Sequence, residues 1–217
     1  MADKETSPRA VERVAFFSDA VIAIALTLLA LELPVPEGTH LPDFVASFGE
    51  HRDEYIAFLL AFVVVGGTWL AHHKLFRFMA ATDTLLLVIN LVTLFALVLV
   101  PWASKTLDTS EDGSGIALYS LVMALIGASS LWLTLHAKRA GLMYEDTPKA
   151  LFDGIWVKAG LPGAMFAVSA PLALWIQAWV YLMWPLVYVG IAIFYMIRRL
   201  MKPRSAVPPA RSTPATS

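Results

Sequence analysis

The sequence contains no cysteine, and only 15% of its residues are charged. The absence of cysteine excludes disulfide bonds, thiolate metal sites and cysteine nucleophiles, but it leaves the redox compartment undetermined. Soluble domains carry about 25% charged residues, so the low value argues against a soluble fold. The formal net charge is −1, and the chain therefore lacks the basic excess of a strongly basic nucleic-acid-binding protein.

Apolar residues make up 58% of the 217 residues, which is more than a soluble fold of this size can bury. A helix needs about 20 mostly apolar residues to cross a bilayer. Six segments fit this pattern and predict an all-α integral membrane protein with six transmembrane helices: 14–33, 55–71, 85–103, 115–135, 155–175 and 178–197. The fifth is the least regular, because it contains Lys158, Pro162 and Pro171. The first is too long for a signal-peptide core and carries Asp19 and Glu32, which argues against cleavage.

The positive charges predict the orientation of these segments. Lys and Arg are concentrated in the flanks on one side, whereas the opposite loops contain only Arg52 and Lys105. The positive-inside rule places the basic side, and with it both termini, in the cytoplasm. The chain then divides into a cytoplasmic N-terminal arm (1–12), a six-helix membrane domain (13–200) and a disordered cytoplasmic tail (201–217).

The first outer loop contains a short amphipathic segment, 41–48. Pro42 near its start and Asp43 in its first turn predict a helix. Its apolar face would rest on the membrane surface or on the other helices. The acidic residues of the outer loops are interpreted as solvated positions, and a mild attraction of cations is the alternative.

The first apolar segment differs from the others because it carries a carboxylate, which suggests a function or a specific partner. At 100° per residue, one stripe of this helix consists of Phe17, Ala20, Ile24, Thr27, Leu28 and Leu31. Asp19 lies about 140° from Ile24, so the carboxylate and the stripe face different surroundings. Neither Arg13 nor Ser18 is four residues from Asp19, so we expect its partners to come from another helix.

The second segment ends in an aromatic residue and two histidines at the same depth as Asp19. A hydrogen-bonded cluster is physically reasonable there, with a structural or pH-sensitive role. The predicted cluster consists of Arg13, Ser18, Asp19, Trp69 and either His72 or His73. Adjacent histidines diverge by about 100° on a helix, and no further ligand set accompanies them, so we predict no metal site.

The pattern Arg13-x-x-x-Phe17-Ser18-Asp19 at the start of a membrane helix resembles the signature of the transmembrane protein 175 family of potassium channels. The six segments and the basic cytoplasmic side also resemble its bacterial members, over about residues 9–200. The resemblance implies a homotetramer in the bacterial inner membrane, with a pore lined by the first helix of each subunit. It implies neither a cofactor nor an enzymatic activity. Like that family, the sequence has no Thr-Val-Gly-Tyr-Gly filter loop.

The same resemblance implies roles for residues of the stripe. A large apolar side chain five positions after the motif aspartate narrows the pore, and this position is Ile24. A hydroxyl three positions later is tied to a preference for K⁺ over Na⁺, and this position is Thr27. Leu28 and Leu31 would add further apolar layers. The motif residues are expected to join helices and subunits and not to touch ions.

Other interpretations stay open. An apolar stripe on a membrane helix is often only packing or lipid contact. A secondary transporter, coupled to protons through Asp19 and His72, is the alternative function, although the sequence shows no clear internal repeat. No HExxH or GxSxG pattern supports an enzyme.

Several polar and small residues are expected to have structural roles. Hydroxyls that bond a carbonyl of their own helix are predicted for Thr68, Thr93 and Thr134. Asn90 should bond between helices. Gly66-Gly67 and Gly127-Ala128 are predicted to allow close helix packing. Glu32 marks the membrane boundary or attracts cations at an outer mouth.

Overall fold

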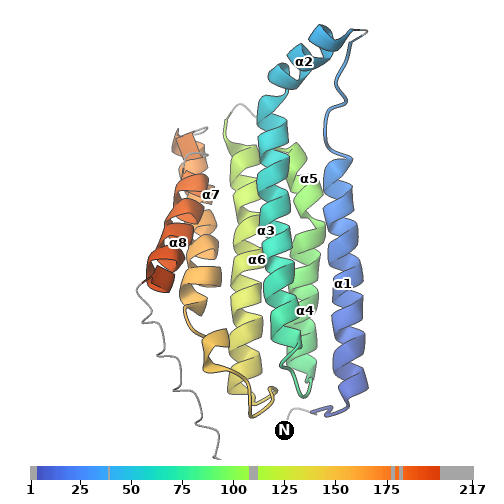
Figure 1. Ribbon diagram of the computed structural model, residues 1–217, viewed down its shortest axis with the longest axis vertical. Helices are drawn as coiled ribbons and strands as arrows, with labels where there is room; N and C mark the ends of the chain where they lie inside the picture. The colour runs from blue at the N-terminus through green and yellow to red at the C-terminus, as the bar shows by residue number, and fades with distance from the viewer. Residues whose placement is uncertain (1–3, 39, 108–111, 177–178, 181–182, 201–217) are drawn as a thin grey trace, which may run out of the picture.

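The described part of the chain folds into a bundle of helices (Figure 1). The computed structural model describes residues 4–38, 40–107, 112–176, 179–180 and 183–200. The helices are α1 (Pro8–Ala30), α2 (Leu41–Glu50), α3 (Arg52–Phe76), α4 (Thr84–Val98), α5 (Val100–Lys105), α6 (Ser114–Arg139), a 3-10 turn (Lys149–Leu151), a π-helical turn (Trp156–Gly160), α7 (Leu161–Ile176) and α8 (Met183–Leu200). Within these residues the only β structure is two isolated antiparallel bridges, so the all-α prediction is confirmed.

Four helical stretches are long and apolar enough to cross a membrane, and they match the first four predicted segments: Pro8–Ala30, Glu54–Phe76, Thr84–Lys105 and Ser114–Arg139. The apolar helices Leu161–Ile176 and Met183–Phe194 are shorter. The fifth predicted segment begins in the π-helical turn. The predicted sixth segment starts at residue 178, which lies outside the described residues, and α8 begins only at Met183. Six spans therefore remain a prediction.

The first helix begins earlier than its apolar run predicts. Pro8 occupies the first turn of α1, where proline costs no hydrogen bond and its fixed φ favours the helix. The predicted N-terminal arm (residues 1–12) therefore overlaps α1, whose first residue is Pro8. The predicted tail, 201–217, lies outside the described residues.

The helix α6 has its closest neighbour in α7. A Cβ atom added at Gly127 would lie 2.6 Å from the Cα of Gly163, so only glycine allows this approach. The prediction of close packing is therefore confirmed for Gly127. It is wrong for Gly66 and Gly67 within the described chain, because an added Cβ there meets no atom within 4 Å.

The predicted short helix of the first loop is present as α2, which projects beyond the end of the bundle (Figure 1). The Glu37 N–H donates to the buried Ser47 hydroxyl over 3.1 Å. Phe44 and Phe48 of its apolar face stay exposed, and Phe48 contacts the ring of Tyr55. Within the chain, the apolar face of α2 therefore rests only marginally on another helix.

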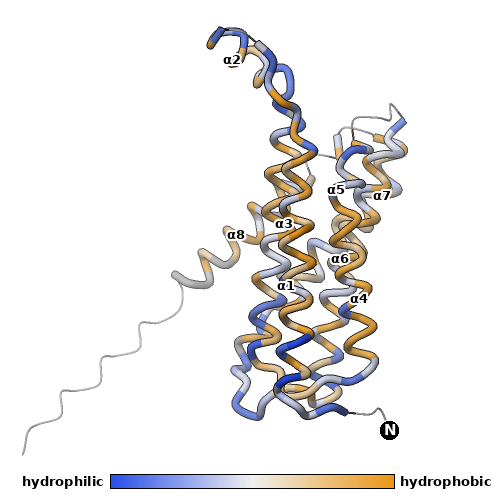
Figure 2. The backbone as a smooth tube through the Cα atoms, turned by 90° about the vertical axis from the view of Figure 1, so that its right-hand side faces the viewer, coloured by the Kyte–Doolittle hydropathy of each residue, from blue (hydrophilic) through white to orange (hydrophobic). Residues whose placement is uncertain are grey.

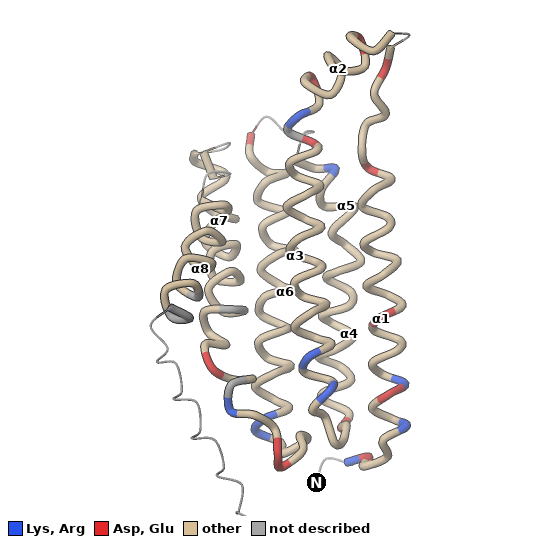
Figure 3. The backbone as a smooth tube through the Cα atoms, in the orientation of Figure 1, with Lys and Arg blue, Asp and Glu red and all other residues tan. Residues whose placement is uncertain are grey.

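Charge and hydropathy divide the bundle along its length. Apolar residues dominate the middle of the long helices (Figure 2), and Lys and Arg gather at the end where the N-terminus lies (Figure 3). At this end Asp83 caps α4 by accepting from the Leu86 N–H over 2.7 Å, and it pairs with His136 of α6 at 2.9 Å. This polar end fixes α4 against α6.

Candidate pore helix and its hydrogen-bonded support

The two sides of α1 have different surroundings. Ser18, Ile22, Ala25 and Leu29 are buried against α3 and α4. The predicted stripe is on the other side. Its large apolar side chains are exposed, with Phe17 at 54%, Ile24 at 58%, Leu28 at 39% and Leu31 at 76%, and Ala20 and Thr27 are exposed as well. The packing of the chain itself therefore leaves this stripe uncovered.

The hydroxyl of Thr27 lies on this exposed side. It donates to the carbonyl of Ile24, three residues earlier in the same helix, over 2.8 Å. Because its proton is bonded inside the helix, the lone pairs of the oxygen remain available to a cation or to water.

Asp19 has its partner on another helix, as predicted. The indole N–H of Trp69 on α3 donates to the Asp19 carboxylate over 2.8 Å. The ring of Trp69 also packs against His73, with centroids 5.5 Å apart. The bond ties α1 to α3 at the basic end of the bundle.

The neighbouring Ser18 belongs to a second, fully buried chain of hydrogen bonds. Its hydroxyl donates to Val14 O over 2.8 Å and accepts from the Asn90 amide over 2.9 Å. The Asn90 oxygen is 2.9 Å from Nε2 of His72. His72 stacks on Phe76 at 4.2 Å. Asn90 of α4 thus joins α1 to α3.

This geometry revises the predicted cluster in two ways. Among the described residues, neither histidine is hydrogen-bonded to Asp19; His72 bonds Asn90 and His73 is exposed. Arg13 is exposed and has no hydrogen bond or ion pair within the described chain. Asn90 was predicted to bond between helices, which is confirmed, but its place in this cluster could not be predicted. The sequence offered one signal for this role, namely that Asn90 is a single amide side chain in a mostly apolar segment.

The smaller predictions are tested by the same contacts. Thr68, Thr93 and Thr134 each bond the carbonyl four residues earlier, as expected. Glu32 pairs with Lys105 of α5 at 2.8 Å. The pair lines a cavity of about 390 Å³ with Leu29, Ala57 and Phe58, among other residues. Glu32 is therefore partly neutralised, which favours the boundary role.

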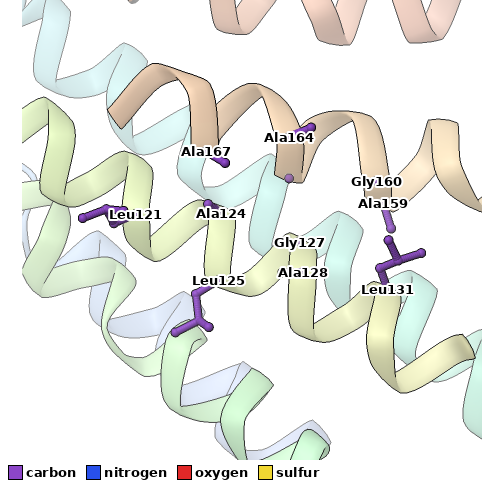
Figure 4. Close-up of a pocket in the computed structure, with 11 residues that line it drawn as sticks. Leu121, Ala124, Leu125, Gly127, Ala128, Leu131, Ala159, Gly160, Ala164 and Ala167 are labelled. Atoms are coloured by element: carbon purple, nitrogen blue, oxygen red, sulfur yellow. The ribbon is translucent and has the colours of Figure 1, made fainter. Parts of the chain in front are cut away.

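The cavity between α6 and α7 has no polar side chain in its lining. A groove of about 460 Å³ between α6 and α7 is lined only by Leu, Ala and Gly residues (Figure 4). Among the residues that the structure describes, no group of three or more Asp, Glu or His side chains could hold a metal ion. The candidate site is therefore the exposed stripe of α1 with its polar support.

Comparison with known proteins agrees with this arrangement. The family described as "Endosomal/lysosomal potassium channel TMEM175" matches residues 13–101, which include most of α1 and all of α3 and α4. A protein of Streptomyces collinus named a potassium channel is 34% identical over 175 residues, 75% of this chain and 85% of the relative. The chain belongs to the TMEM175 family.

Two further relatives extend the comparison. The crystal structure of a lysosomal potassium-selective channel TMEM175 homolog from Chamaesiphon minutus superposes with a TM-score of 0.64 at 25% identity, over 88% of this chain and 98% of that one. The Danio rerio protein named an endosomal/lysosomal proton channel is 33% identical over half of this chain but only 22% of its own length. The family consists of ion channels, so the chain is not an enzyme.

Proposed function

We propose that this protein is a potassium-preferring cation channel, assembled as a homotetramer whose pore is lined by α1 of each subunit. The observation that carries the proposal is the exposed stripe of α1, which stays uncovered although the opposite side is buried and hydrogen-bonded. The names of the Streptomyces and Chamaesiphon relatives support potassium as the permeant ion.

Ile24 forms the hydrophobic constriction. Four copies of this side chain around an axis exclude water when they are close, and a dry constriction blocks ions. Leu28 and Leu31 add apolar layers toward the outer end. A small tilt or rotation of α1 widens the ring, lets water enter and starts conduction.

Thr27 provides selectivity next to the constriction. Its oxygen, with the proton bonded to Ile24 O, presents lone pairs that replace part of the hydration shell of K⁺. A hydroxyl dipole is weaker than a cage of carbonyls, so the preference for K⁺ over Na⁺ is modest. No cofactor takes part.

The motif residues position α1 and do not contact ions. Asp19 is held by Trp69, and Ser18 is held by Asn90, which itself is bonded to His72. Arg13 and Phe17 are exposed, and they are available for contacts between subunits. His73 packs on the Trp69 ring.

The membrane arrangement follows from the same proposal. Residues 13–200 form one six-helix domain in the bacterial inner membrane, with lipid as its surroundings, and the basic end of the bundle faces the cytoplasm. The π-helical turn and α7 together form the fifth span, and α8 the sixth. Both termini are then cytoplasmic.

A liposome flux assay tests the proposal. Purified protein is reconstituted, and flux is followed under a K⁺ gradient and, separately, a Na⁺ gradient. We expect rapid flux down the K⁺ gradient without a coupled ion and slower flux of Na⁺. Flux that occurs only against an opposing proton or Na⁺ gradient would instead indicate a secondary transporter working through Asp19 and His72.

A further inference from the structure

A short segment before α1 is fixed to the rest of the bundle at its basic end; we call residues 4–7 the N-terminal strap. The Glu5 N–H donates to Thr82 O over 2.9 Å, and the Thr82 N–H donates to Glu5 O over 3.0 Å. The Lys4 ammonium donates to Ala140 O. Pro8, the first residue of α1, follows directly.

The strap is bonded to a turn that is itself buried and hydrogen-bonded. Thr82 lies in the turn between α3 and α4, next to the buried Asp83. Burial raises the pKa of Asp83, but the bonds from the Leu86 N–H and His136, and the nearby charges of His136 and Lys4, lower it below its usual value. Its carboxylate therefore stays ionised and continues to hold α4 and α6 together.

The same turn is also bonded to the segment that follows α6. The N–H groups of Ala80 and Ala81 both donate to Leu142 O, and the Tyr144 N–H donates to Phe78 O. The two turns form one hydrogen-bonded unit, and the strap reaches both of its halves through Thr82 and Ala140.

The start of α1 has few other attachments. Val11 is the only buried residue between Pro8 and Val14, whereas Arg9, Glu12 and Arg13 are exposed. The next fixed point is the Ser18–Asp19 pair, about 15 Å further along the helix. The strap is therefore the main polar constraint on the first two turns.

We propose that the N-terminal strap sets the tilt of α1 and thereby holds the constriction at Ile24 narrow. This inference rests on the proposed pore function. Ser18 and Asp19 act as the pivot, and Ile24 lies about 9 Å beyond it on the other side. If α1 tilts as a rigid rod about this pivot, a displacement of its strap end moves Ile24 in the opposite direction. The displacement of Ile24 is a little over half as large, because its distance from the pivot is about 9 Å and that of the strap about 15 Å.

Two variants at one position isolate the backbone contact. Glu5→Pro removes the N–H that bonds Thr82 O, whereas Glu5→Ala removes the same exposed side chain and keeps both backbone bonds. The full-length channel in lipid nanodiscs is compared by hydrogen–deuterium exchange over residues 9–14, and in liposomes by K⁺ flux.

We expect Glu5→Pro to speed exchange over residues 9–14 and to raise K⁺ flux by between about two- and tenfold, the range that one net hydrogen bond allows. Glu5→Ala should match the wild type. Lys4→Ala removes only the bond to Ala140 O, and it should act in the same direction with a smaller effect. It also keeps the test decisive if the proline variant does not fold.

Three results overturn the inference, and they are distinguishable. Unchanged exchange over residues 9–14 in both Glu5→Pro and Lys4→Ala means that the strap does not constrain α1. Faster exchange with unchanged flux, in a channel whose flux does respond to Ile24→Asn, means that the strap does not act on the constriction. If neither Glu5→Pro nor Ile24→Asn alters flux, the proposed pore itself is wrong.

Discussion

The two faces of α1 differ in how far the rest of the chain covers them and forms hydrogen bonds with them. The buried face is closed by specific polar bonds, with Ser18 bonded to Asn90 and with the adjacent Asp19 held by Trp69. The opposite face presents Ile24 and Leu31 without any cover. Lipid contact also requires an exposed apolar face, and α4 has one at Leu91 and Phe95. The distinguishing feature of α1 is therefore the pair of polar anchors, Ser18 and Asp19, behind its exposed face.

The difference between the two faces indicates which residues can be substituted without loss of stability. On the buried face, removing one partner leaves another polar group unpaired, so substitution there affects stability. On the exposed face nothing within the chain depends on the side chain, so substitution there should leave the fold intact and change conduction. The two faces therefore predict two separable sets of phenotypes.

The largest effect is expected at the constriction. Ile24→Asn places an amide where the ring must be dry, so water enters and K⁺ flux rises by about tenfold, equivalent to a barrier about 1.4 kcal/mol lower. The measurement is liposome flux. Ala23→Asn is the control, since Ala23 is exposed on the same helix but off the stripe. Equal flux in Ile24→Asn and wild type, with both well folded, would remove Ile24 from the gate.

On the buried face, Asn90→Leu should cause the next largest effect. The substitution leaves Nε2 of His72 buried without its partner and removes the hydrogen bond that joins α4 to Ser18 of α1, at a cost of about 1–3 kcal/mol. The Tm of the purified protein should fall by roughly 3–10 °C.

Thr93→Val is the matched control for that variant, because Thr93 is buried on the same helix but bonds only Ile89 O of its own helix. A Tm of Asn90→Leu no lower than that of Thr93→Val would show that the amide does not join the helices.

Sequence reasoning could predict the two faces of α1 because helix geometry alone separates Asp19 from Ile24. It could not predict that Asn90 lies between Ser18 and His72, since the residues come from three helices and spacing along the chain does not say which helices are neighbours. The assignment of a histidine to Asp19 was open for the same reason.

The fold was predictable where the pattern is local. Long, mostly apolar runs predicted the first four segments, and Pro42 with Asp43 predicted α2. The prediction of close helix packing at Gly66 and Gly67 was wrong within the described chain, because a glycine pair permits close packing without requiring it. The fifth segment was irregular in sequence and is irregular in the structure, where a π-helical turn precedes Pro162.

A smaller effect is expected from Thr27→Val, which keeps the shape of the side chain and removes its oxygen from the exposed face. The ratio of K⁺ to Na⁺ flux should fall by about twofold to fivefold, less than 1 kcal/mol of discrimination, while total flux is kept. Thr68→Val on α3 is the control, because this hydroxyl bonds Val64 O away from the stripe. An unchanged ratio would show that the permeant ion does not touch the Thr27 hydroxyl.

The smallest effect is expected from Asp19→Asn, which tests whether the motif belongs to the supporting face. Asparagine keeps an oxygen that can accept from the Trp69 N–H, so the fold is retained, but the bond loses the strengthening that an ionised acceptor provides. The tetramer should dissociate at a lower detergent concentration, as measured by light scattering after size-exclusion chromatography, and the K⁺ to Na⁺ flux ratio should not change. Trp69→Phe removes the donor and should weaken assembly more. A normal oligomer with altered ion preference would place Asp19 on the conducting side and contradict the distinction between the two faces, because the same carboxylate would then contact ions and not only anchor α1 to Trp69.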